Sequence, residues 1–140
     1  MTSILSASAE AVCVDPKQVT CIWECVKHWI KRAMERGDFG TFDAIEDDVM
    51  TGQALLWLVW NAPKIQGAAV TQIVTTQMSK ICMITACGGK NMQLWLPLIE
   101  KIESYARDEG CDAVRILGRK GWTRVLKTYR APAVILERRL

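Results

Sequence analysis

A glycine-rich break precedes one helical segment of the sequence, and its residue types can bind an anion. Residues 88–91, Gly-Gly-Lys-Asn, separate an apolar segment at 81–86 from an amphipathic segment that follows. Glycine lets the backbone approach a ligand closely, and the free N–H groups at the start of a helix attract negative charge. The break is therefore a candidate anion site, and the alternative is an ordinary turn before a helix.

Three potential metal ligands share one face of a second helical segment. Cys21, Cys25 and His28 follow one another at i, i+4 and i+7, a spacing that could supply three ligands to a metal ion. No fourth ligand is near in the sequence, and helix packing alone explains the pattern. The chain has six cysteines and no CxxC pair, which is typical of reduced, buried side chains in a cytosolic protein. We therefore expect no metal.

Positive charge is concentrated at the C-terminal end of the chain. Residues 115–140 contain eight basic side chains and one acidic side chain, whereas residues 1–114 contain ten basic and fourteen acidic ones. This asymmetry indicates either a polyanionic partner, such as nucleic acid or a phosphorylated cofactor, or simply a solvated basic face. No nucleic-acid-binding motif or interleaved aromatic platform accompanies the charge, so nucleic acid is not the expected partner.

Four segments have the pattern of helices. Asp15 and Pro16 are a typical helix start, and apolar residues at helical spacing continue to a stop at Gly37. A shorter helix is predicted over 41–50. The most amphipathic helix is predicted to begin near Trp95, because Pro97 disfavours a helical residue before it, and to end at Gly110. A short basic helix is predicted over 119–127.

Five segments have the pattern of strands, at 54–60, 65–75, 81–86, 112–117 and 133–137. The first three have short connections and are predicted to form an antiparallel meander. The strand–helix–strand unit over 81–117 is predicted to be a right-handed parallel crossover. The element order is then α-α-β-β-β-α-β-α-β, which defines an α/β (α+β) fold with a mixed sheet that is mostly antiparallel.

The length of 140 residues predicts a single domain over 1–140, with residues 1–14 as a partly mobile N-terminal segment. No apolar run reaches the ~20 residues that span a bilayer. The N-terminus lacks the basic start and the apolar run of a signal peptide. We expect a cytoplasmic protein that does not bind membranes.

The element order and three sequence segments resemble the GNAT superfamily of N-acetyltransferases. The segments are Ile-Thr-Ala-Cys-Gly-Gly-Lys-Asn-Met at 84–92, Ile-Glu-Ser-Tyr-Ala-Arg-Asp-Glu-Gly at 102–110 and Gly-Arg-Lys-Gly-Trp at 118–122. The resemblance covers roughly residues 15 to 139. Small GNAT-like proteins of tailed phages and prophages look similar in length and in the C-terminal half.

The resemblance implies a site for acetyl-coenzyme A. In the family, amides of the glycine-rich turn and the following helix start bind the pyrophosphate, and the edge of the preceding strand pairs with the pantetheine amides. Basic residues such as Arg119 or Lys120 would meet the cofactor phosphates. The implied cofactor-binding residues are Ile84, Ala86, Gly88, Gly89, Lys90, Asn91 and Met92.

The resemblance gives less guidance on catalytic residues. Many members of the family have a tyrosine as general acid in the last short helix, and Leu126 aligns with it here. Tyr129 lies close by and is a candidate, with packing as the alternative. Glu46 and its neighbours at 47–48 border the acceptor cleft in the family alignment, so Glu46 is a candidate base; the alternative is the solvent face of a short helix. For His28 we expect a partly buried structural role.

Two functions from different classes follow. The resemblance implies transfer of an acetyl group from acetyl-coenzyme A to an unidentified amine, on a small molecule or a protein. The alternative is a catalytically inactive protein that uses the fold for interaction, such as a virion or assembly component of a phage or prophage. Leu126 and the six tryptophans favour the second, since exposed tryptophans suit protein partners or self-association.

Overall fold

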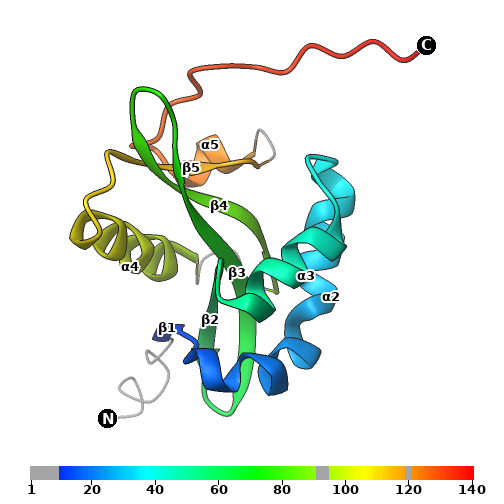
Figure 1. Cartoon of the computed structure of the whole chain (residues 1–140), viewed down its shortest axis with the longest axis vertical. Helices are drawn as coiled ribbons and strands as arrows, with labels where there is room; N and C mark the ends of the chain where they lie inside the picture. Colours follow the sequence, from blue (N-terminus) through cyan, green and yellow to red (C-terminus); the bar gives the residue numbers. More distant parts are fainter. Residues whose placement is uncertain (1–9, 91–94, 119–120) are drawn as a thin grey trace.

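The computed structural model describes residues 10–90, 95–118 and 121–140 of the chain (Figure 1). The strands in these ranges are β1 (Glu10–Cys13), β2 (Leu55–Asn61), β3 (Lys64–Thr75), β4 (Lys80–Gly89) and β5 (Ala113–Ile116). The helices are η1 (Pro16–Gln18), α2 (Val19–Gly37), α3 (Phe42–Thr51), α4 (Trp95–Asp108) and α5 (Trp122–Val125). The order of the helices and strands from η1 to α5 agrees with the sequence prediction.

The ends of the first helices are set by their capping residues. The Asp15 carboxylate accepts a hydrogen bond from the Lys17 amide at 2.9 Å, which fixes the start of η1. α2 ends where Asp38 adopts a left-handed conformation with φ 53° and its amide donates to the Met34 carbonyl. Thr41 caps α3 by accepting from the Ala44 amide at 3.2 Å. These contacts confirm the predicted helix starts.

The five strands form one sheet in the order β1-β2-β3-β4-β5. β1 to β4 are successively antiparallel. β4 and β5 are parallel over Ile81–Ile84 and Ala113–Ile116, with α4 as the crossover between them. The predicted mixed sheet with one parallel strand–helix–strand unit is confirmed.

Both faces of the sheet are covered, by α2 and α3 on one side and by α4 on the other (Figure 1). Alternate residues of β2 serve the two faces, as expected of a continuous apolar strand. Leu56 and Leu58 pack with α2, whereas Trp57 and Val59 pack with α4. The α2 side chains in the first core are Trp23, Val26 and Ile30, and those of α4 in the second are Leu98, Ile99 and Ile102.

Two predicted elements are wrong, and one strand was not predicted. Residues Glu10–Cys13 of the segment 1–14 form β1, which pairs with β2 and buries Ala11. Only Trp122–Val125 is helical within the described part of the predicted basic helix. Residues 133–137 form no strand, since no strand among the described residues pairs with them. In the described residues, no helix is long and apolar enough to cross a membrane.

Candidate functional site

A bulge in β4 is the first irregularity of the sheet that bears on function. Val70 of β3 lies opposite Ala86, and Thr71 lies opposite Ile84, so Thr85 has no residue opposite it. The Thr85 hydroxyl donates to the Val70 carbonyl at 3.2 Å. A bulge of this kind bends its strand and increases the local twist, so it redirects the second half of β4.

Beyond the bulge, β4 parts from β5. The last pair between the two strands is Ile84 and Ile116, yet β4 continues to Gly89. On that side, no strand of the described chain pairs with residues 85–89, while β3 pairs with them on the other. An open edge of this length can pair through its backbone with an extended ligand that carries amide groups. Ala86, Gly88 and Gly89 of the predicted cofactor set lie on this edge, and Ile84 lies where it begins.

The two glycines lie within β4, not in a turn after it, and this corrects the sequence prediction. A Cβ at Gly88 would lie 3.0 Å from the Trp29 carbonyl oxygen, so glycine allows α2 to pack closely on the strand. A Cβ at Gly89 would overlap the Gln66 carbonyl oxygen and the Gly67 Cα, both in the backbone of β3. Glycine is therefore required at position 88 by the packing of α2 on β4, and at position 89 by the closeness of β3.

Lys90 follows the strand with its side chain exposed. Its amide donates to the Gln66 carbonyl at 2.9 Å, so this amide is not free to bind a phosphate as the turn prediction required. The ammonium group remains available to an anion. Asn91 and Met92 of the predicted set, and the basic pair Arg119 and Lys120, lie outside the described residues.

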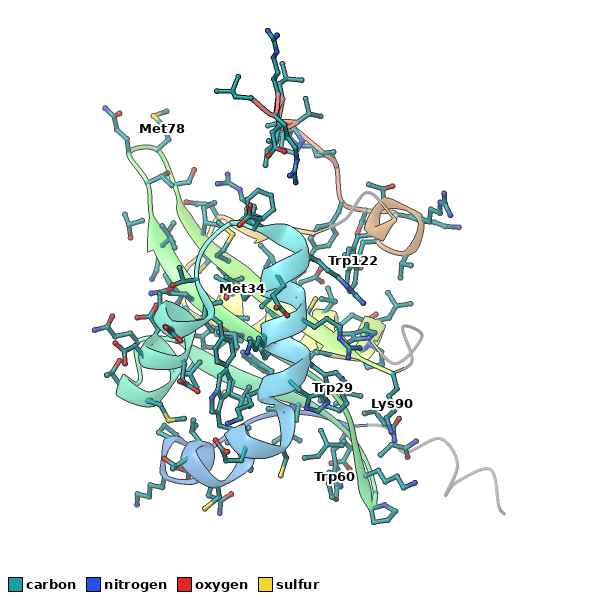
Figure 2. The ribbon with its side chains drawn as sticks, turned by 90° about the vertical axis from the view of Figure 1, so that its right-hand side faces the viewer. Trp29, Met34, Trp60, Met78, Lys90 and Trp122 are labelled. Carbon is teal, nitrogen blue, oxygen red and sulfur yellow. The ribbon has the colours of Figure 1, made fainter. Side chains whose placement is uncertain are left out.

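Tryptophans from three helices lie near this end of β4, and Figure 2 labels two of them, Trp29 and Trp122. Trp29 of α2 contacts Gly88, and Trp95 at the start of α4 lies against Gly67 and Gly89. Trp122 of α5 meets Trp95 edge to face, with ring centroids 6.1 Å apart. Trp29 and Trp122 are half-buried, so they present apolar surface beside the open strand edge.

Tyr129 is held by α4. Its hydroxyl donates to a Glu103 carboxylate oxygen at 2.7 Å, and its ring packs on the second core. Burial, together with this hydrogen bond to a carboxylate, raises the Tyr129 pKa well above its usual value of 10.0. The phenol therefore stays neutral and keeps its hydrogen bond to Glu103. Leu126, which the sequence resemblance aligns with the family's tyrosine, is 5% exposed and part of the same core.

Changing Tyr129 to phenylalanine tests this structural role. We expect the free energy of unfolding to fall by about 2 kcal/mol, because a hydrogen bond to a carboxylate is lost. The folded protein keeps the phenolic proton that the unfolded chain releases near pH 10, so the wild type loses stability as pH rises above that value. The variant should lose roughly 1 kcal/mol less by pH 11. Urea unfolding at pH 8 and 11 measures both effects, and equal losses in the two proteins would contradict the assignment.

Glu46 joins α3 to α2. One of its carboxylate oxygens accepts from the Trp23 indole N–H at 2.7 Å, and the Trp23 side chain is fully buried. Trp23 also stacks on Phe42, with ring centroids 5.9 Å apart. Glu46 thus satisfies a buried donor, while its neighbours at 43 and 47 are exposed. The structure places Glu46 in helix packing and not beside the open edge of β4.

The cysteines and the histidine add no catalytic group to the edge. Cys87 lies on β4, and burial raises the pKa of its thiol to about 12, so the nucleophilic thiolate is suppressed. His28 is exposed next to Trp29, which corrects the expected partly buried role. Cys21 and Cys25 are also exposed. Over the described ranges, no group of three or more His, Cys, Asp or Glu side chains is placed to hold a metal ion.

The mostly antiparallel sheet with one parallel strand–helix–strand unit is the GNAT-like fold that the sequence resemblance implies. The comparisons with solved structures agree. A tetramutant of the BH1408 protein from Bacillus halodurans superposes with a TM-score of 0.67 at 15% identity, over 93% of this chain and 99% of the other. A predicted acetyltransferase from Clostridium acetobutylicum, solved with acetyl-CoA, gives 0.66 at 10% identity over 94% and 96%.

A third similar structure is an aminoglycoside acetyltransferase from an uncultured soil metagenomic sample, in complex with sisomicin. Its TM-score is 0.65 at 11% identity, over 94% of this chain and 96% of the other. No protein-family model matches the sequence. No curated protein matches it either. With identities this low, the likeness establishes the GNAT-like fold alone.

Proposed function

We propose that this protein is an N-acetyltransferase that transfers an acetyl group from acetyl-coenzyme A to an amine. The observation that carries the proposal is the open edge of β4 beyond the Thr85 bulge, where the strand has left β5. Support also comes from the fold, shared along almost the whole chain with acetyltransferases, one of them solved with acetyl-CoA. The amine remains unidentified; one neighbour in the fold binds an aminoglycoside, itself a polyamine.

The residues present fit the amide-bearing arm of the cofactor better than its phosphates. Backbone groups of Ala86 to Gly89 would pair with the pantetheine amides, and the flanking Trp29 and Trp122 would exclude water from that arm. The exposed Lys90 ammonium would neutralise a phosphate. Acetyl-coenzyme A, when bound, would supply the thioester carbonyl that an amine attacks, and coenzyme A would leave as the free thiol.

Neither of the two candidate catalytic residues is placed to move a proton from the acceptor. An ammonium acceptor must lose a proton before attack, and this requires a base or an ordered water. In the described chain, Tyr129 is neutral and donates to Glu103, and Glu46 accepts from Trp23. We propose that the acceptor reaches the site as a free amine or passes its proton to water. The rate should then rise with pH towards the pKa of the amine.

Binding of acetyl-coenzyme A is expected to raise the melting temperature. At a ligand concentration 100 times Kd, mass action adds about 2.7 kcal/mol to the stability, which is roughly 8 °C for a domain of this size. Lys90→Glu should reduce the shift, whereas Lys17→Glu, an exposed lysine on η1, should leave it unchanged. The measurement is a thermal unfolding scan with acetyl-coenzyme A up to millimolar concentration. The absence of any shift would contradict the proposal.

A second candidate is a protein that keeps the fold and binds without transferring an acetyl group. The buried Leu126 and the Glu103-bound Tyr129 favour it, since neither can act as the family's general acid. A thermal shift with acetyl-coenzyme A, but no release of free thiol across a panel of amines, would support this candidate over the enzyme. For this second candidate, the similarity to phage or virion proteins stays a prediction.

A further inference from the structure

The C-terminal segment of the chain has no partner in the fold. Residues 130–140 are exposed and form neither helix nor strand, and in both figures they lead away from the sheet (Figures 1 and 2). Val134, Ile135 and Leu136 are 78%, 65% and 91% exposed. Three consecutive large apolar side chains in water indicate a surface that is covered in use. Branched apolar residues of this kind also favour the extended conformation of a strand.

The sheet of the same chain ends in an uncovered edge. β5 pairs with β4 on one side, and its outer backbone groups face no strand of the described residues. Val114 and Ile116 point to the α4 side, where they pack on the second core and remain half-buried. Unpaired backbone donors and acceptors at an edge are a template for another strand.

We propose that two copies of the chain associate by exchanging these segments, with residues 133–138 of each copy adding an antiparallel strand to β5 of the other. A two-fold axis makes the exchange reciprocal, so both tails and both edges are satisfied at once and the assembly closes as a dimer. This inference does not depend on acetyl transfer.

Side-chain pattern and charge select one register for the added strand. Placing Leu136 beside Val114 of the other copy also places Val134 beside Ile116, because opposite residues of an antiparallel pair run in reverse order. Both tail side chains then extend the core under α4. The same register brings Arg138 opposite Asp112, which is exposed at the start of β5.

The chain before the tail is consistent with this exchange. Tyr129 is tied to Glu103 of α4, and Leu126 packs in the core that also contacts Val114 and Ile116, so each tail emerges near its own β5. In the proposed dimer the two β5 edges face each other, so each tail also lies near the β5 edge of the other copy. Eleven extended residues, 130–140, can span about 36 Å. Pro132, which has no N–H, suits the position just before an edge strand.

Sedimentation of the full chain over a range of concentrations tests the proposal. We expect a dimer, and a monomer of unchanged circular dichroism when residues 131–140 are deleted. Arg138→Glu should raise the dimer dissociation constant about tenfold or more, since it faces Asp112. Arg139→Glu, the matched charge reversal whose side chain would point to the other face of the strand, should change it less than threefold.

Hydrogen exchange distinguishes a second copy from the chain's own edge. Amides of 133–137 and 113–116 should gain protection together as concentration rises. A monomer with unprotected tail amides at every concentration would overturn the proposal. So would a dimer that survives the deletion, or tail protection that is independent of concentration, because the tail would then pair with its own β5.

Discussion

Changing Gly89 to alanine is expected to lower the free energy of unfolding by about 3 kcal/mol, the upper range for overpacking. The added Cβ would overlap the Gln66 carbonyl oxygen and come within 2.6 Å of the Gly67 Cα. Both atoms belong to the backbone of β3, so they cannot move aside as a side chain would. The ends of β3 and β4 must separate, and the melting temperature should fall by roughly 10 °C.

The same change should weaken the response to acetyl-coenzyme A. Gly89 lies at the end of the open edge, and separation of β3 from β4 displaces the strand that the ligand would pair with. Gly121→Ala is the matched control, since a Cβ there meets nothing within 4 Å and the backbone φ is −60°. Its stability should stay within about 0.5 kcal/mol of the wild type. Urea unfolding followed by circular dichroism measures both variants, and equal stabilities would contradict the packing role of Gly89.

The parts of the fold that follow from local pattern were predictable. Apolar periodicity and caps define α2, α3 and α4, because a helix buries one face at a fixed spacing. The strand β2 follows from a continuous apolar run, and β3 and β4 follow from the turns that bound them. By contrast, β1 and the segment 133–137 depend on whether a neighbour pairs with them. The sequence of a short segment does not carry that information, so one strand was missed and one was predicted without a partner.

The candidate site was predictable in place but not in detail. The sequence resemblance indicated the end of β4, and the structure places Ala86, Gly88 and Gly89 on the open edge there. It misread the glycines as a turn, because the contacts that require them come from Trp29 and from β3, which are distant in sequence. The Thr85 bulge left no signal, since it results from the register of two strands. The Tyr129–Glu103 bond joins residues 26 positions apart and was equally hidden.

Changing Trp23 to alanine is expected to have the largest effect on stability, about 4 kcal/mol. Trp23 is fully buried, stacks on Phe42 and donates to Glu46, so the change leaves a cavity between α2 and α3 and removes the partner of a half-buried carboxylate. Trp60→Ala, at a half-buried position on β2, should cost less than half as much. Chemical unfolding of the two variants provides the comparison.

Glu46→Gln then separates the packing role of Glu46 from a catalytic one. The glutamine oxygen can still accept from the Trp23 indole, so the free energy of unfolding should fall by less than about 1 kcal/mol, while Glu46→Ala should cost more because the buried donor is left unpaired. A catalytic base would show the opposite pattern, since an amide cannot take a proton from an amine. Because Glu46 connects α3 to α2, the proposed function predicts that the acetyl-transfer rate of the glutamine variant stays within threefold of wild type. A loss of a hundredfold or more at unchanged stability would instead make Glu46 the base.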